Sequence, residues 1–327
     1  MRKRWFAFWT AIVMMLNACS YNQDISRINI GGVDYCDVTQ LTVQALSQIW
    51  LEMGLASEMR VTRGSVESAD LLESGRLISA IISQGVARQY VGRSVSEAPD
   101  APKSNSNIRA GVVLSRRYSQ AWTVRNDIQN YLDFENKVIC VGPEGGSGKE
   151  YLEKILGALG IKPRKYIYAD YDKSQEILQS GRADVFFGCL EAPACFVDRD
   201  IDVLGARVIS LTDTQIDIVL KEQPMFVAHN FPDRAYGEQY KGMRTVGDHY
   251  VYCFSKNVPE DIVYNFVKNI FDNKHILQLH SDEYDDFGPE YLNQLILPLH
   301  NGAYRYYVEK GIWVPDTAKP IDSLGTK

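Results

Sequence analysis

The stretch Lys137-Val-Ile-Cys-Val-Gly-Pro-Glu-Gly-Gly-Ser-Gly-Lys-Glu-Tyr151, continued by Leu152-Glu-Lys-Ile-Leu-Gly-Ala-Leu-Gly160, predicts a strand, a glycine-rich turn and a helix. Val138 to Val141 is a short apolar run, as in a buried strand, and from Glu150 the apolar residues recur at helical spacing until Gly160. Such a turn points free backbone N–H groups and the positive end of the helix dipole at the space beyond the strand. The turn is therefore predicted to hold an anion.

A nucleotide-binding P-loop is one interpretation of this turn, and its spacing argues against it. The P-loop pattern needs glycine, four residues and then Gly-Lys-Ser/Thr, whereas Pro143 stands at the first glycine and Glu150 at the hydroxyl position. Since no hydroxyl is available for magnesium, a small molecule that carries a carboxylate is the favoured occupant. A tight turn without a ligand is the alternative.

Residues 1–18 are predicted to be a signal peptide of the lipoprotein type. Arg2-Lys3-Arg4 precedes an apolar segment, Trp5 to Leu16, that is too short to span a bilayer permanently. The segment ends in Leu16-Asn17-Ala18-Cys19, which resembles a bacterial lipobox, and a diacylated Cys19 would anchor the exported protein on the periplasmic side of a membrane. Because the residue at position 17 is unusual there, ordinary cleavage to a soluble periplasmic protein stays open. Residues 19–26 are then a linker.

Charge and cysteine content restrict the possible partners. Loss of the leader takes the formal net charge from −6 to −9, and an acidic chain is a poor ligand for nucleic acid, whose phosphates bind Lys and Arg. Roughly 300 mature residues favour two lobes over one core. An exported protein can form disulfides, and Cys189 and Cys195 are the only cysteines close in sequence, so that a bridge between them stays open. Cys140 and Cys253 lie in apolar runs typical of buried thiols.

Strand, glycine and helix units recur along the chain and predict an α/β fold. The first lobe is expected to contain a strand at 27–30, a helix that includes residues 41–50, a helix capped by Ser65 and ended by Gly75, and a strand at 78–84. Strands at 108–114 and 122–124 lead into a second lobe with a strand at 166–168, a helix at 174–178 and a strand at 183–187. Ligands of such sheets bind beyond the carboxyl ends of the strands.

Two phrases of helix, glycine and strand, Gly75 to Gln84 and Gly181 to Phe187, resemble the lobes of periplasmic solute-binding proteins with the type II topology. The tail Leu297-Pro-Leu-His-Asn-Gly-Ala-Tyr-Arg-Tyr-Tyr-Val-Glu-Lys-Gly311 resembles the closing signature of the TAXI family, the solute receptors of one branch of TRAP transporters. This resemblance runs from about Ile28 to Gly311.

The resemblance implies a two-lobed fold of the periplasmic-binding-protein type II, each lobe a mixed, mainly parallel sheet with helices on both faces. Residues 27–112 plus 250–327 would form lobe 1, and residues 113–249 lobe 2. It also implies a receptor that closes over a small carboxylate, of the amino-acid or dicarboxylate class, and delivers it to a sodium-coupled TRAP membrane subunit. An orphan receptor or sensor on the same fold, without a transporter partner, is the alternative.

Carried over from the family, the ligand-binding positions are Tyr35, Ser65, Ser83, Gln84, Gly145, Gly146, Ser147 and Phe187. A tyrosine in a glycine turn also suits a ligand lid, because it pairs an apolar body with a hydrogen-bonding tip. This sequence departs from the family pattern in the cleft: Cys36 stands where a second tyrosine is usual, and Glu191 stands where a glycine is expected before Pro193. The sequence therefore keeps the family features of the two lobes and differs from the family in the ligand pocket.

No catalytic or metal motif is found among the remaining polar residues. His300 precedes Gly302-Ala-Tyr-Arg-Tyr-Tyr, which favours a structural role at a helix start over catalysis, and the other histidines lack metal-site spacing. The acidic stretch 281–286 lacks the spacing of an EF-hand and is predicted to be a solvated face. The tyrosines at 304, 306 and 307 would border the cleft or pack a helix on the sheet. The expectation is a binding protein without enzymatic activity, cofactor or metal.

Overall fold

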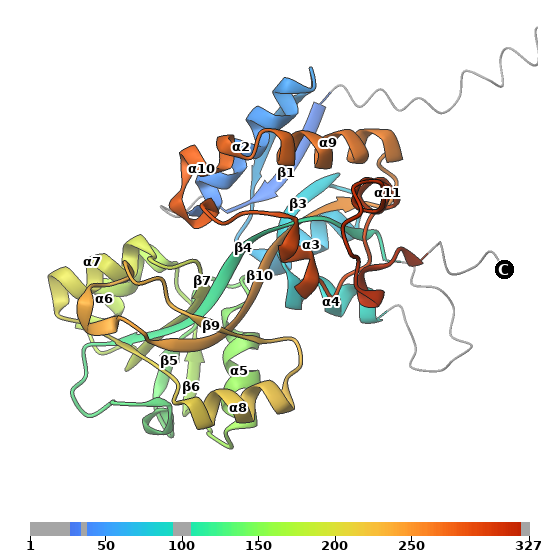
Figure 1. Cartoon of the computed structure of the whole chain (residues 1–327). Coiled ribbons are helices and arrows are strands. Elements are labelled where there is room, and N and C mark those ends of the chain that lie inside the picture. Colours follow the sequence, from blue (N-terminus) through green and yellow to red (C-terminus); the bar gives the residue numbers. More distant parts are fainter. Residues whose placement is uncertain (1–26, 34–37, 94–105, 322–327) are drawn as a thin grey trace, which may run out of the picture.

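The computed structural model describes residues 27–33, 38–93 and 106–321, and it consists of two lobes joined by one continuous sheet (Figure 1). The strand order is β2-β1-β3-β10-β4-β7-β5-β6, with β8 added to β4 and β9 added to β10. The two long central strands, β4 (Ile108–Thr123) and β10 (Arg244–Ser255), run antiparallel from one lobe into the other. The expected lobe boundaries, at 112/113 and 249/250, fall inside these two strands.

The first lobe is built around three further strands, which are parallel to one another. Its elements are β1 (Arg27–Gly32), β2 (Ala56–Val61), β3 (Ser79–Ser83), α2 (Val38–Glu52), α3 (Ser65–Glu73), α4 (Gln84–Arg93), α9 (Glu260–Asp272), α10 (His275–His280) and α11 (Asn301–Glu309). Helices α2, α9 and α10 cover one face of the sheet, and α3 and α4 lie on the other (Figure 1). Two 3-10 helices, Asp282–Tyr284 and Pro289–Gln294, precede α11.

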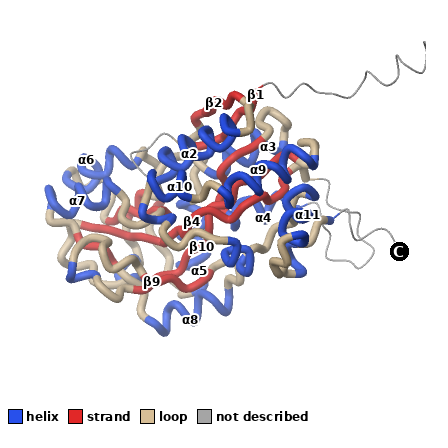
Figure 2. Tube along the Cα trace, turned by 45° about the horizontal axis from the view of Figure 1, so that its top comes forward, coloured by secondary structure: helices blue, strands red, loops and turns tan. Residues whose placement is uncertain are grey.

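The second lobe repeats this scheme around β5. Its elements are β5 (Val138–Cys140), β6 (Lys165–Ile167), β7 (Val185–Leu190), β8 (Arg207–Ile209), β9 (Val227–Asn230), α5 (Gly148–Ala158), α6 (Ser174–Gln179), α7 (Cys195–Leu204) and α8 (Asp213–Glu222). Strand β5 pairs in parallel with β6 and β7, while β4 pairs with β7 in the antiparallel sense. The strands form an unbroken band through both lobes (Figure 2). The predicted α/β, two-lobed fold class is confirmed.

Aromatic side chains form the centre of each lobe. In the first lobe, Trp50 packs against Phe266, with ring centroids 4.4 Å apart, and its indole N–H donates to the Tyr252 hydroxyl at 2.9 Å. In the second lobe, Trp122 stacks on Phe186 at 4.9 Å. Each aromatic contact adds about 1 kcal/mol beyond the burial of its area. These packed centres make each lobe a firm support for the residues that face the other lobe.

Several local predictions can be compared with the structure. The strand at 138–141, the helix that ends before Gly160 and the helix at 174–178 are confirmed with shifts of one or two residues. The two strands expected at 108–114 and 122–124 are parts of the single strand β4. His300 accepts a hydrogen bond from the Gly302 N–H at 3.2 Å and caps α11, as its structural interpretation predicted. Burial lowers the pKa of this imidazole to about 4.

The structure decides the cysteine pairing that the sequence left open. The thiol of Cys189 is free, as are those of Cys140 and Cys253, whereas Cys195 is disulfide-bonded. A bridge between Cys189 and Cys195 is therefore not formed. Within the part of the chain that the structure describes, no helix combines the length and apolar character needed to cross a membrane. The predicted signal peptide and the lipidation site Cys19 lie outside the described residues.

Candidate functional site

Two glycine turns, each at the start of a helix, meet between the lobes. The first, Arg63 to Ser65, opens α3, and the second, Gly142 to Ser147, opens α5. The Gly145 carbonyl accepts hydrogen bonds from the backbone N–H groups of Val66 at 3.2 Å and Glu67 at 3.3 Å. A Cβ added to Gly64 would lie 2.7 Å from the Gly146 Cα, so the backbones touch. The lobes are closed on each other at this point.

A cavity of about 20 Å³ remains under the two turns, which we call the front cleft. It is lined by Val33, Arg63, Gly64, Ser65, Arg117, Pro143, Gly146, Ser147, Tyr171, Cys189, Leu190 and Tyr250. A cavity of this size holds about one water molecule. An amino acid therefore enters only when the lobes move apart from this arrangement.

The guanidinium group of Arg117 lies at the base of the front cleft. It comes from β4, is 2% exposed, and forms an ion pair with Asp248 of β10 at 2.9 Å. Its second terminal nitrogen donates to the Ser147 hydroxyl at 2.8 Å and to the Cys189 carbonyl at 2.5 Å. The rings of Tyr250 and Tyr151 lie 4.6 and 5.1 Å from its central carbon. One cation thus joins the hinge strands to the glycine turn of the second lobe.

The carboxylate of Asp248 balances this buried cation. It accepts hydrogen bonds from the Gly85 N–H, at 2.9 Å, and from the Tyr151 hydroxyl. Burial lowers the pKa of Arg117, but the nearby Cys189 and Asp248 raise it, and the net pKa lies well above the usual value. Burial likewise raises the pKa of Tyr151 far above its ordinary range. The arginine stays charged and the phenol neutral throughout the physiological range of pH.

Two buried polar atoms near this network lack a hydrogen-bond partner among the described residues. They are Nε of Arg117 and the hydroxyl oxygen of Ser83. Unpaired buried groups of this kind cost about 1–3 kcal/mol each. Because the Ser83 N–H donates to the Ser65 hydroxyl at 2.9 Å, Ser65 and Ser83 adjoin each other at the first turn. Arg117 lines the front cleft, whereas the predicted ligand residue Ser83 does not.

The structure brings some of the predicted ligand residues together and not others. Ser65, Gly146 and Ser147 line the front cleft, and Gly145 carries the contact between the lobes. Ser65 is the first residue of α3, and Gly64 occupies the cap position without a side-chain hydrogen bond. The prediction that Ser65 caps the helix is therefore wrong by one residue, because its hydroxyl is engaged by the neighbouring strand instead.

Gln84 and Phe187 do not reach the front cleft. The Gln84 side chain donates to the Gln294 carbonyl and accepts from the Ile296 N–H, both at 3.0 Å, and thus holds the segment before α11. Phe187 is fully buried in the core. Tyr35 lies outside the described residues, and so does Cys36.

The sequence analysis missed Arg117, Asp248 and Tyr250. Arg117 and Asp248 stand directly opposite each other in the ladder between β4 and β10, 131 residues apart in the sequence. The available signal was the presence of charged residues inside strands that are otherwise buried.

Comparison with known proteins agrees with this architecture. Residues 31–311 match the NMT1-like family. A protein crystallised with bound L-arginine is 13% identical, with a TM-score of 0.50 over 80% of this chain and 91% of that chain. A structure described as an L-cystine ABC transporter protein from Listeria monocytogenes is also 13% identical, with a TM-score of 0.50 over 80% and 96% of the two chains.

Both likenesses concern the fold, which is the two-lobed fold of periplasmic binding proteins. No curated protein shows significant similarity to the sequence. The family match covers most of the chain, including both glycine turns and both hinge strands. The chain belongs to the NMT1-like family.

Proposed function

We propose that this protein is an exported solute-binding receptor, anchored to a membrane through a lipid on Cys19, that captures a small carboxylate between its lobes. The proposed recipient is the membrane subunit of a TRAP-type transporter, as the resemblance of the sequence to the TAXI family suggests. The ligand class is an amino acid or a dicarboxylate. The protein binds its ligand and leaves it chemically unchanged.

One observation carries the proposal: Arg117 lies buried between glycine turns that come from opposite lobes. A guanidinium group can donate two parallel hydrogen bonds to a carboxylate. Here one edge of the group binds Asp248 and Ser147, while Nε is left without a partner among the described residues. The Nε–H is therefore the donor that a ligand carboxylate would contact.

The start of α3 supplies a second anchoring point. In the closed arrangement its N–H groups, at Val66 and Glu67, donate to the Gly145 carbonyl oxygen. A helix N-terminus binds anions, and a ligand carboxylate would replace this oxygen once the lobes part. Closure would then place the ligand in contact with both lobes, which shifts the population from the open to the closed state.

Titration calorimetry and thermal unfolding of the purified mature chain test the proposal. We expect glutamate, 2-oxoglutarate or succinate to raise the melting temperature, by about 5 °C or more at 100 times the dissociation constant. Ser147→Ala should weaken binding about tenfold, the effect of one hydrogen bond to a charged group. Ser180→Ala, an exposed serine after α6, is the matched control. No response to any carboxylate, with both variants folded, would contradict the proposal.

The membrane anchor and the transporter have their own tests. Cys19→Ser should move the protein from the membrane to the soluble fraction of cells. Uptake of the identified ligand should fall when the gene is deleted. A TRAP-type partner makes that uptake depend on a sodium gradient, whereas an ABC transporter would make it depend on ATP. Uptake that survives sodium removal and stops on ATP depletion would contradict a TRAP partner.

The front cleft also favours a second candidate, an orphan receptor or sensor without a transporter. Its internal ion pair and its volume of about 20 Å³ allow the lobes to close without a large ligand. Such a receptor would bind a partner protein in its closed form. Unchanged uptake of the ligand after gene deletion would favour this candidate over the transport receptor.

A further inference from the structure

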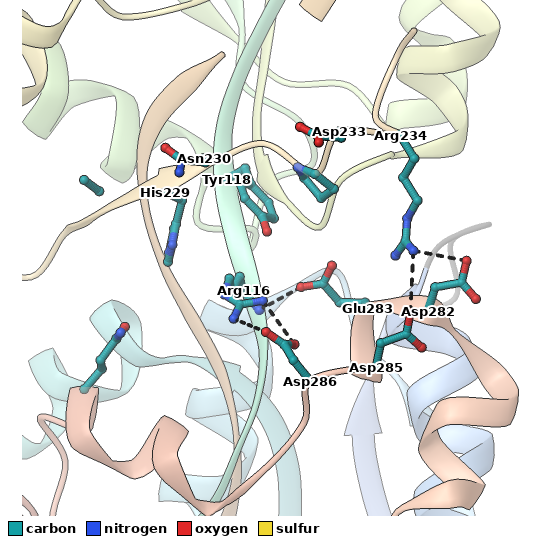
Figure 3. Close-up of a pocket in the computed structure, with 13 residues that line it drawn as sticks. Arg116, Tyr118, His229, Asn230, Asp233, Arg234, Asp282, Glu283, Asp285 and Asp286 are labelled. Atoms are coloured by element: carbon teal, nitrogen blue, oxygen red, sulfur yellow. Dashed lines mark hydrogen bonds and ion pairs between the residues drawn. The ribbon is translucent and has the colours of Figure 1, made fainter. Parts of the chain in front are cut away.

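A second and larger pocket lies on the other side of the hinge strands (Figure 3). Its volume is about 670 Å³, within the range of small-molecule sites. We call it the rear pocket, and it is lined by Arg116, Tyr118, Ala228, His229, Asn230, Pro232, Asp233, Arg234, Asp282, Glu283, Asp285, Asp286 and Gln294. Nothing in the proposed capture of a carboxylate uses it.

The alternation of side chains along β4 separates the two sites. Successive residues of a strand point to opposite faces, so Arg117 faces the front cleft while Arg116 and Tyr118 face the rear pocket. The walls of the rear pocket come from both lobes. β9 and the segment 232–234 belong to the second, and the 3-10 helix at Asp282–Tyr284 belongs to the first. A ligand there would contact both lobes, as a ligand in the front cleft would.

The cations of the rear pocket are already paired. Arg116 binds both oxygens of Asp286, at 2.6 and 3.3 Å, and Arg234 bridges the lobes to Asp282 at 3.2 Å and Asp285 at 4.0 Å (Figure 3). The remaining lining charges are carboxylates. The pocket therefore has an excess of negative charge.

Glu283 is a carboxyl group that the sequence analysis placed on a solvated face, and that prediction is wrong for this residue. It is 5% exposed, and its carboxylate is turned toward Arg116 (Figure 3). It accepts the Arg116 backbone N–H at 3.3 Å, and the hydroxyl of Tyr118 points toward the same region. Asp233, from the second lobe, also lines the pocket and is exposed.

The uncharged lining groups offer hydrogen bonds without adding positive charge. Burial lowers the pKa of His229 to about 4, so its ring is neutral at pH 7, and Tyr118 keeps its proton. Among the described residues, no group of three or more acidic, His or Cys side chains is arranged to hold a metal ion. The excess negative charge thus faces a space suited to a molecule rather than to a bare ion.

We propose that the rear pocket binds a small organic cation, an amine or guanidinium compound, between Asp233 of the second lobe and Glu283 of the first. Two carboxylates in one pocket, one from each lobe, favour a compound with two cationic groups, or one cationic group and a hydrogen-bonding tail. Because both lobes contribute, binding is linked to the arrangement of the lobes.

Calorimetry on the mature chain at pH 7.5 and low salt, with 1,4-diaminobutane as the probe, tests this proposal. We expect saturable binding of the diamine and none of 1,4-butanediol, which has a similar length without charge. Succinate should bind only in the front cleft and should not displace the diamine. Asp233→Asn and Glu283→Gln should each weaken diamine binding about tenfold, the effect of one charge-assisted hydrogen bond. Asp217→Asn changes the net charge equally at an exposed position of α8 and should leave diamine binding unchanged.

Three results would overturn the proposal. The first is the absence of diamine binding, and the second is binding that both pocket variants retain in full. The third is displacement of the diamine by calcium at equal concentration, with calcium binding lost in the same variants, which would make the pocket a metal site.

Discussion

Arg116 and Arg117 are consecutive residues of β4, and their guanidinium groups lie on opposite sides of the hinge. Arg117 pairs with Asp248 under the closed front cleft, at 2.9 Å, and Arg116 pairs with Asp286 in the rear pocket, at 2.6 Å. One strand thus carries a cation into each of the two spaces between the lobes. A movement of the lobes that opens one space must change the walls of the other, since both share the hinge strands.

The buried pair of Arg117 and Asp248 should be costly to break. Arg117→Met leaves the carboxylate of Asp248 without its counter-charge in a fully buried position, so we expect the free energy of unfolding to fall by about 3–5 kcal/mol. Urea denaturation measures this loss. The double variant with Asp248→Asn should be destabilised by clearly less than the sum of the two single changes. Additive losses would show that the two groups do not interact.

The contact between Gly64 and Gly146 should control closure of the front cleft. Gly64→Ala places a Cβ 2.7 Å from the Gly146 Cα, so the turns must separate and the radius of gyration from X-ray scattering should rise. Affinity for the carboxylate should fall about tenfold, which corresponds to roughly 1.4 kcal/mol of lost contact.

Gly75→Ala is the matched control for this change. Gly75 follows α3 with φ of +72°, and a Cβ there would meet no atom within 4 Å. The control should lose about 1–2 kcal/mol of stability through backbone strain but keep the closed form and its ligand affinity. An unchanged scattering profile for Gly64→Ala would contradict the role of this contact.

The glycine turns could be predicted from the sequence because their signals are local. A strand, a glycine cluster and a helix start lie within a few residues of one another, and the turn before α5 was predicted in this way. The choice of Gly145 and Ser147 as ligand positions came from the family resemblance. The pairing of Arg117 with Asp248 could not be predicted, because it depends on the register of two strands far apart in the sequence. The burial of Glu283 could not be predicted for a related reason. Its neighbours in the sequence are acidic, and its contact with Arg116 forms only in the folded chain.

The free thiols should resist alkylation in the native state. Burial raises the pKa of Cys140 to about 11 and that of Cys189 to about 12, and Cys253 is shifted in the same direction. Because only the thiolate reacts, iodoacetamide at pH 8 should label none of the three until urea unfolds the chain. Peptide mass spectrometry reads the labels. Cys195 should stay unlabelled in urea until a reductant is added. A cross-linked peptide that joins Cys189 to Cys195 would contradict the structure.

The stability of the protein should depend on pH through Glu283. Burial raises the pKa of its carboxyl from the usual 4.5 to about 7, against the opposing effect of Arg116. The stabilising contribution is complete below pH 4.5 and is lost as the pH rises through 7, because the folded state then holds a buried charge. Glu283→Gln removes this loss. Between pH 4.5 and 8, the variant should therefore gain about 3 kcal/mol of unfolding free energy relative to wild type. Each unit of the pKa shift from 4.5 to about 7 is worth about 1.4 kcal/mol.

The difference in unfolding free energy between Glu283→Gln and wild type also separates the effect of Glu283 from that of the buried histidines. Burial lowers the pKa of His229 to about 4 and of His249 to about 3, so their contribution runs the other way and is lost as the pH falls below 6.5. Both proteins share these histidines, and subtracting one profile from the other removes their effect. Glu290→Gln, at an exposed position of the 3-10 helix at Pro289–Gln294, should follow the wild-type profile. Urea titrations at pH 4.5, 6 and 8 measure the curves. A difference between Glu283→Gln and wild type that stays constant over this range would mean that the carboxyl titrates normally and is not confined at the base of the rear pocket.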